Sequence, residues 1–224
     1  MEDIVKIVER DIVGKMNPTL QVLFINGAEI KVCFVKWARR GKTVTDVDNV
    51  AHIILSVNHA ENIITLQTEP AEGDLVLEMP LFMHGTPREV NHEWTARPKM
   101  EITKVPAIWL VEPVEETEFD RESSLERESD LRLIFFDSRD GSQWLNKDIH
   151  EERTQSLLNL KSEFKQAIAR NTRFKNTEQG RTRNLNKLGT ESLSGFQKNI
   201  IDADLTALDH REPLLVYCAN NCKC

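Results

Sequence analysis

Residues 104–111 read Lys-Val-Pro-Ala-Ile-Trp-Leu-Val, and residues 131–136 read Leu-Arg-Leu-Ile-Phe-Phe. Each is a short and nearly continuous apolar run, which is typical of a β-strand that is buried on both faces. Further along the chain, apolar side chains recur at the spacing of one helical face: Leu157, Leu160, Phe164 and Ile168. We therefore expect two central strands covered by a helix, with one shared core of Trp109, Phe135, Leu157, Leu160 and Phe164.

The first hundred residues predict one helix followed by strands. Apolar residues within 3–16 keep helical spacing, and Asn17-Pro18 ends that pattern, because a residue before proline avoids the helical region. Strands are expected at 20–25 and 29–37, joined by the hairpin turn Asn26-Gly27. Residues 38–100 are punctuated by glycine and proline. We interpret them as a β-rich insertion, with strands at 49–57, 62–68 and 75–79.

The end of the chain predicts a helix, an irregular stretch and a hairpin. Asp148, with Glu151 three residues later, fits the start of a helix that ends near Arg170. Residues 171–189 are polar and basic and are expected to be irregular, and 199–208 and 213–218 are expected to form a closing hairpin. These patterns predict an α+β fold: one domain of residues 1–37 and 101–224, interrupted by the insertion at 38–100.

Composition limits the possible classes of protein. The chain has 224 residues, a hydrophobic fraction of 40% and a charged fraction of 29%, which are ordinary values for a folded domain. No apolar run approaches the length of a membrane span, and the acidic start Met1-Glu2-Asp3 is unlike a signal peptide. Four cysteines, three of them within the last seven residues, are too few and too clustered for a disulfide framework. We therefore expect synthesis in a reducing cytoplasm and no membrane partner.

Charge is divided unevenly along the chain. Residues 112–130 hold nine acidic side chains and two arginines, whereas 161–187 hold eight basic and two acidic side chains. Such runs are often solvated surface. The alternative is that the two segments meet across a subunit boundary, where complementary charge sets register and partner choice. The interface candidates are Glu115, Glu116 and Glu118 on the acidic side, and Arg170, Arg173, Lys175, Arg181 and Arg183 on the basic side.

The acidic stretch 115–129 is also expected to be a mobile loop. It consists mainly of charged residues, serine and threonine, and has little apolar content to offset the entropy lost on ordering.

Two other patterns suggest chemistry. Asp137, Asp140 and Glu151 follow an apolar strand, where a magnesium-dependent hydrolase would keep its carboxylates, although Ser138 to Gly141 is also ordinary turn sequence. Cys218, Cys222 and Cys224 could bind zinc with His210 or Cys33 as a fourth ligand, but a frayed chain end favours an inert tail. We therefore expect no catalytic residue, no cofactor and no metal, and we expect deletion of 220–224 to be tolerated.

The order of segments resembles tail-terminator and neck proteins of tailed bacteriophages. Several segments carry the resemblance, in this order: an N-terminal helix followed by 22–27, the runs 104–110 and 131–136, Trp144-Leu145 with the helix at 148–170, and 204–208 with the strand into Tyr217 and Cys218. These motifs are apolar and generic, and the stretch 38–100 has no counterpart in the resemblance.

The resemblance implies a small antiparallel sheet with helices packed on one face. It also implies assembly into a ring, commonly a hexamer, around a DNA channel. The partners would be the tail tube and the head connector, the location would be the virion, and DNA would pass without sequence-specific contacts. The alternatives are a metal-dependent hydrolase or nuclease that uses Asp137 and Asp140, and a non-enzymatic adaptor.

Overall fold

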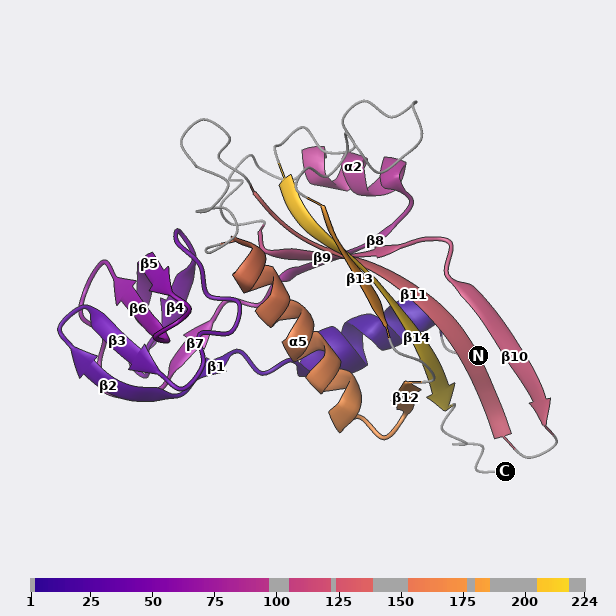
Figure 1. Cartoon of the computed structure of the whole chain (residues 1–224), viewed down its shortest axis with the longest axis horizontal. Coiled ribbons are helices and arrows are strands. Elements are labelled where there is room, and N and C mark those ends of the chain that lie inside the picture. The colour runs from indigo at the N-terminus through magenta and orange to yellow at the C-terminus, as the bar shows by residue number, and fades with distance from the viewer. Residues whose placement is uncertain are drawn as a thin grey trace.

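A computed structural model describes residues 3–96, 105–121, 124–138, 153–176, 180–185 and 205–217. In these residues the protein is a strand-rich mixed α/β fold with two seven-stranded sheets (Figure 1). The α+β expectation is confirmed at this level. The Asp148 cap, Trp144-Leu145, Asp140, Glu151 and the cysteines after Tyr217 lie outside the described residues.

The first sheet is an antiparallel half-barrel with the strand order β1-β7-β4-β5-β6-β3-β2. Its strands are β1 (Thr19–Leu20), β2 (Val22–Asn26), β3 (Glu29–Val32), β4 (Thr43–Thr45), β5 (Ala51–Asn58), β6 (Ile63–Leu66) and β7 (Leu75–Leu77). Only Gln21 separates β1 from β2, so one continuous stretch of chain supplies both end strands of the sheet. This arrangement encloses an apolar interior, into which Ile30, Ile54 and Ile64 are fully buried.

The hairpin at Asn26-Gly27 is confirmed, and Gly27 has the positive φ of 58° that its turn requires. The strand expected at 29–37 ends earlier, at Val32, where β3 stops pairing with β2. Because β3 also pairs with β6, residues 22–32 share a sheet with 43–77. The strands are therefore divided between the two sheets near residue 80, a different division from the one drawn at 37 and 101.

The second sheet has the order β12-β14-β11-β9-β8, with β10 also paired to β11 and β13 also paired to β14. Its strands are β8 (Leu81–Gly85), β9 (Ala107–Val111), β10 (Glu115–Arg121), β11 (Ser124–Ser138), β12 (Phe174–Asn176), β13 (Arg181–Leu185) and β14 (Leu205–Tyr217). β8 and β9 are parallel, so the expectation of a purely antiparallel sheet is wrong for this pair.

Two expected loops are strands. The acidic stretch is not a loop, because β10 forms a seven-residue antiparallel hairpin with the long strand β11. The expected closing hairpin is also wrong, since β14 runs unbroken for 13 residues along β11. The charged residues that looked like a turn form ion pairs across these two strands: Asp209 with Arg132, and Arg211 with Asp130. Cross-strand partners of this kind stabilise a strand that its own composition does not favour.

The stretch 171–189 is likewise more regular than expected. Phe174–Asn176 and Arg181–Leu185 both pair with β14, as β12 and β13. The preceding helix is confirmed as α5 (Gln155–Arg170).

Helices cover both faces of the second sheet, which corrects the expectation of one covered face (Figure 1). An N-terminal helix begins as α1 (Ile4–Ile7), continues as a π-helical turn over Val8–Ile12 and ends in a 3₁₀ turn at Val13–Lys15. It packs with α5 against the face that presents Ile108 and Phe135. The helix α2 (Pro87–Ala96) lies on the opposite face and was not predicted from the sequence.

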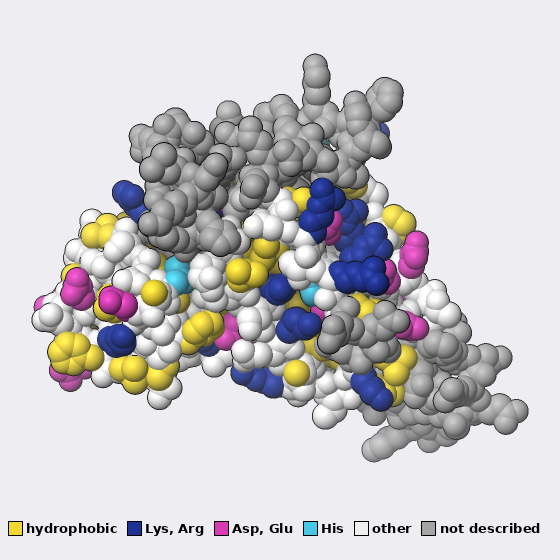
Figure 2. All heavy atoms as spheres, in the orientation of Figure 1, with side chains coloured by type: hydrophobic (Ala, Val, Ile, Leu, Met, Phe, Trp, Pro, Cys, Tyr) yellow, Lys and Arg dark blue, Asp and Glu magenta, His cyan; other side chains and the backbone are white. Residues whose placement is uncertain are grey.

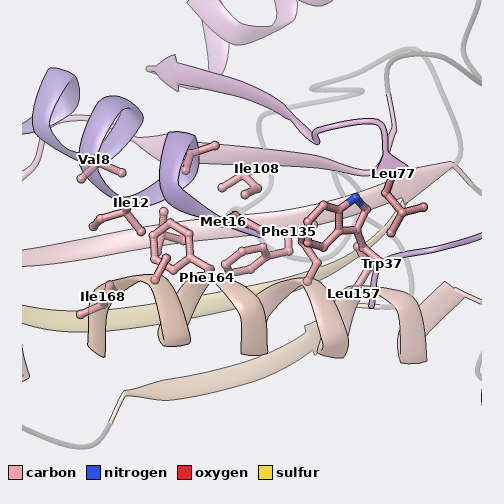
Figure 3. Close-up of a cluster of buried hydrophobic side chains, with 14 of the residues drawn as sticks. Val8, Ile12, Met16, Trp37, Leu77, Ile108, Phe135, Leu157, Phe164 and Ile168 are labelled. Carbon is pink, nitrogen blue, oxygen red and sulfur yellow. The ribbon is translucent and has the colours of Figure 1, made fainter. Parts of the chain in front are cut away.

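One hydrophobic core connects the half-barrel, the N-terminal helix, α5 and the second sheet. Figure 3 shows Val8 and Ile12, Trp37 and Leu77, and the α5 side chains converging on Phe135. Leu157, Leu160 and Phe164 are fully buried in this core, as expected. Trp109 is not part of it. Alternate residues of a strand point to opposite faces, so Trp109 packs with Trp94 and Phe136 beneath α2.

Candidate interface for self-assembly

The acidic and basic segments form opposite edges of the second sheet. β10 pairs with β11 on one side, and no described residue pairs with its other side. At the far edge, β12 and β13 both pair with β14, and their outer sides also have no partner among the described residues. A strand edge without a partner presents backbone N–H and C=O groups that can pair with another chain.

The acidic edge presents carboxylates on both faces of the sheet. Glu115 is exposed and aligned with Asp130 on the face away from α5. Glu116 points to the opposite face, where it accepts a hydrogen bond from Ser129 at 3.1 Å and lies 3.2 Å from the guanidinium of Arg127. Glu118 is aligned with Arg127 in the same hairpin. Glu116 therefore holds the hairpin together, whereas Glu115 makes no ion pair with another described residue.

The basic edge presents its charges on the same face as Glu115. In β13, Arg181 and Arg183 are exposed and aligned with Arg211 and Asp209 of β14. Lys175 of β12 is also exposed. Figure 2 shows a group of Lys and Arg side chains over the region in which Figure 1 draws β13 and β14. One face of the sheet therefore changes from acidic at β10 to basic at β13.

The other two basic candidates do not lie on this edge. Arg170 ends α5 and donates a hydrogen bond to Gln166 at 2.8 Å. Arg173 forms an ion pair of 2.7 Å with Asp11 of the N-terminal helix. The pKa of Asp11 is lowered, first by its hydrogen bond from Arg10 and then by the nearby positive charges. We therefore assign Arg173 to intramolecular packing, and we retain Lys175, Arg181 and Arg183 as interface candidates.

A buried polar network holds β13 against β14. His210 and Glu212 are buried on β14, with the His210 Nε2 and Glu212 Oε2 atoms 2.5 Å apart. His210 Nδ1 lies 2.9 Å from the hydroxyl of Thr182 in β13, and Lys165 of α5 lies 3.4 Å from Glu212. Buried polar side chains are costly unless they are paired, so these contacts fix the position of the strand. This network was not predicted from the sequence, because 209–212 was expected to be the turn between the two arms of a hairpin.

The chain also approaches this network closely just before β13. A Cβ atom added at Gly180 would lie 2.6 Å from Glu212 Oε2 and 2.8 Å from the backbone oxygen of Arg211. A larger residue would collide with these atoms, so the chain can enter β13 along this path only with glycine at position 180.

Asp137 lies in a structural ion pair and not in an open site. Its carboxylate is fully buried, 2.5 Å from the guanidinium of Arg39 and 3.6 Å from that of Arg153. Burial lowers the pKa of Arg39 to about 10, while the charge of Asp137 opposes this shift. The guanidinium groups of Arg39 and Arg153 take the positions around the Asp137 carboxylate that a metal cation would need. Among the described residues, no three His, Cys, Asp or Glu side chains are grouped as in a metal site.

The proposed zinc ligands are not brought together in the described part. Cys33 is exposed at the end of β3, and both ring nitrogens of His210 have protein partners. The pairs formed by His210 leave neither nitrogen open to a metal.

Comparison with known proteins assigns no family to the chain. No protein-family model matches the chain, and no curated protein matches it. Within the described residues, no helix is long and apolar enough to cross a membrane.

Proposed function

We propose that this chain is a structural subunit that assembles head-to-tail with copies of itself into a closed ring. The expected setting is the virion of a tailed bacteriophage, as tail terminator or neck ring, and the resemblance suggests a hexamer. The observation that carries the proposal is the second sheet, whose edges at β10 and at β12 and β13 have opposite charge and pair with no other described residue.

A two-fold axis brings the same surface of two subunits together, so it cannot join the β10 edge of one subunit to the unlike edge of β12 and β13 of another. An interface between unlike surfaces is heterologous, and it closes into a ring when the rotation between neighbours is a fraction of a full turn. Complementary charge favours this contact over the pairing of two acidic or two basic edges. The sheet therefore supports a ring better than an isolated monomer or a two-fold dimer.

The same proposal divides the molecule by role. The second sheet, α5 and the N-terminal helix would form the tail-terminator-like body, and the half-barrel would be an addition to it. The described large apolar side chains that remain exposed, among them Phe24, Ile53, Leu55 and Val76, lie on the half-barrel and its loops. Exposed apolar groups mark interaction surfaces. They support contacts with tail-tube or head-connector proteins that are separate from the ring contact.

No catalytic role is part of this proposal. The hydrolase alternative depends on Asp137, whose carboxylate is enclosed by two arginines.

The test is the copy number and shape of the assembled protein. Native mass spectrometry and negative-stain imaging of the purified chain, and quantification of its copies in particles, should show a closed ring of several subunits. A single copy per particle, together with a strictly monomeric purified protein, would contradict the proposal.

A further inference from the structure

We propose that neighbouring subunits are joined by antiparallel β-pairing of β10 from one copy with β13 from the next. This inference rests on the proposed ring and names the contact within it. The second sheet would then continue from one subunit into the next, and the occupant of each free edge would be a second copy of this chain.

The strand directions follow from the register of the sheet. β10 is antiparallel to β11, β11 is antiparallel to β14, and β14 is antiparallel to β13. β10 and β13 therefore run in opposite directions within one subunit. The two strands lie at different heights: β10 pairs with Ser124–Asp130 of β11, whereas β13 pairs with the part of β14 that faces Arg132–Phe136. A ring axis that is inclined to the strands staggers neighbouring copies, as in a β-barrel, and a stagger of about four residues brings β10 and β13 together as an antiparallel pair.

In the described part of the chain, nothing pairs with the outer backbone groups of either edge. In an antiparallel pair, the N–H and C=O groups of alternate residues point away from the first partner. β10 has seven residues and β13 has five, and the register described below aligns Glu115–Thr117 of β10 with Arg181–Arg183 of β13. Backbone pairing of this kind supplies affinity, while side chains on alternate positions supply specificity.

The side chains select the register. Glu115, Arg181 and Arg183 point to the same face of the sheet. They are aligned with Asp130, Arg211 and Asp209, and these three residues lie on the face opposite to the one that packs against α5. A register that places Glu115 opposite Arg183 also places Thr117 opposite Arg181. Glu115 then gains a cationic partner across the boundary, which no described residue provides within the subunit.

β13 is a better partner than β12 for two reasons. β12 has three residues, and its first side chain, Phe174, is buried in the core. In β13, four consecutive side chains from Arg181 to Asn184 are exposed. The network of Thr182, His210 and Glu212 also holds β13 in place before any partner arrives.

Thiol cross-linking tests the contact. The parent is the full chain with Cys33, Cys218, Cys222 and Cys224 changed to serine, and rings must first be observed for this parent. A short thiol-specific cross-linker is then applied to Thr117→Cys, to Arg181→Cys and to the double variant. The double variant should give a ladder of covalent oligomers up to the ring size, and each single variant should remain monomeric on a denaturing gel. The matched control, Glu69→Cys with Arg181→Cys, pairs the same arginine position with an exposed residue of the half-barrel and should give no ladder.

The outcomes separate this inference from the proposed function. Rings that form without a ladder in the Thr117→Cys, Arg181→Cys variant would overturn the pairing and leave the ring intact. Covalent dimers of Thr117→Cys alone would show that two β10 edges meet, and a ladder in the control would show an unspecific contact. Either result overturns the pairing. A parent that forms no ring, alone or in particles, would overturn both proposals.

Discussion

Phe164 connects α5 to the second sheet. Its side chain is fully buried, and its ring meets that of Phe135 edge-on, with centroids 5.6 Å apart. Phe164→Ala should therefore lower the free energy of unfolding by about 3–5 kcal/mol, measured by denaturant titration. Phe24→Ala is the matched control, because Phe24 is 64% exposed, and it should cost less than about 0.5 kcal/mol. Equal losses for the two variants would contradict the packing described here.

Asp46 makes part of the half-barrel sensitive to acid. Its carboxylate accepts hydrogen bonds from the backbone N–H groups of Asp48, Val50 and Ala71, and lies 3.0 Å from His52 Nε2. The hydrogen bond with His52, followed by these backbone bonds, lowers the pKa of Asp46 to about 2. The pKa of an aspartate in the unfolded chain is about 4. Because the pKa of Asp46 is lower in the folded protein, its carboxylate stabilises the fold fully above about pH 4. This stabilisation is lost as the pH falls toward the folded-state pKa.

Asp46→Asn should consequently destabilise the protein at neutral pH, and the difference from the wild type should shrink between about pH 4 and pH 2. Thermal unfolding of both proteins across this range measures the difference. A difference that stays constant down to pH 2 would show that the Asp46 carboxylate has no special stabilisation in the folded state.

At the scale of elements, regular periodicity predicted much of the fold. The N-terminal helix, the hairpin at Asn26-Gly27 and α5 could be predicted, because the signal for each one lies within its own residues. The helix α2 was missed although Thr86-Pro87-Arg88-Glu89 has the signature of a helix start. In the structure, Glu89 accepts hydrogen bonds from the backbone N–H and the hydroxyl of Thr86. This helix was therefore predictable from the sequence.

The strands β10, β13 and β14 could not be predicted in the same way. β10 is mostly charged, and β13 and β14 contain charged residues within short runs that are typical of turns. β13 and β14 are also held by partners far away in the sequence, such as the pair of Arg132 with Asp209. The composition of a short segment does not predict which distant strand it pairs with, or in which register. The sequence did provide the charge difference between the two segments, but their position at opposite edges of one sheet depends on the long-range pairing of β11 with β14.

Gly180 tests whether β13 supplies the contact between subunits. In Gly180→Ala, the new methyl group would collide with Glu212 and with the backbone of Arg211, so the start of β13 should move away from β14. We expect fewer assembled rings by native mass spectrometry, with a smaller loss of thermal stability than in Phe164→Ala. Gly14→Ala is the control, because its nearest contact of 3.3 Å is less severe. Unchanged assembly in Gly180→Ala would remove β13 from the interface.

At the scale of the whole molecule, assembly of the proposed ring depends on the contact between unlike edges of the second sheet. A net charge of −7 opposes the association of identical copies, unless their charges are arranged so that acidic and basic surfaces meet. The sheet has this arrangement, with Glu115 at one edge and Arg181 and Arg183 at the other. Exchanging these charges therefore tests which surfaces meet in the ring.

Charge exchange, followed by native mass spectrometry at low salt, is the most direct measurement. Glu115→Lys alone and Arg181→Glu with Arg183→Glu should each reduce ring formation, because like charges then face each other across the boundary. The triple variant should recover rings, whereas Glu69→Lys, a charge reversal on the half-barrel, should have no effect. Loss of rings in both edge variants with recovery in the triple variant is the predicted result. Rings that form equally well in all of these proteins would contradict the head-to-tail account.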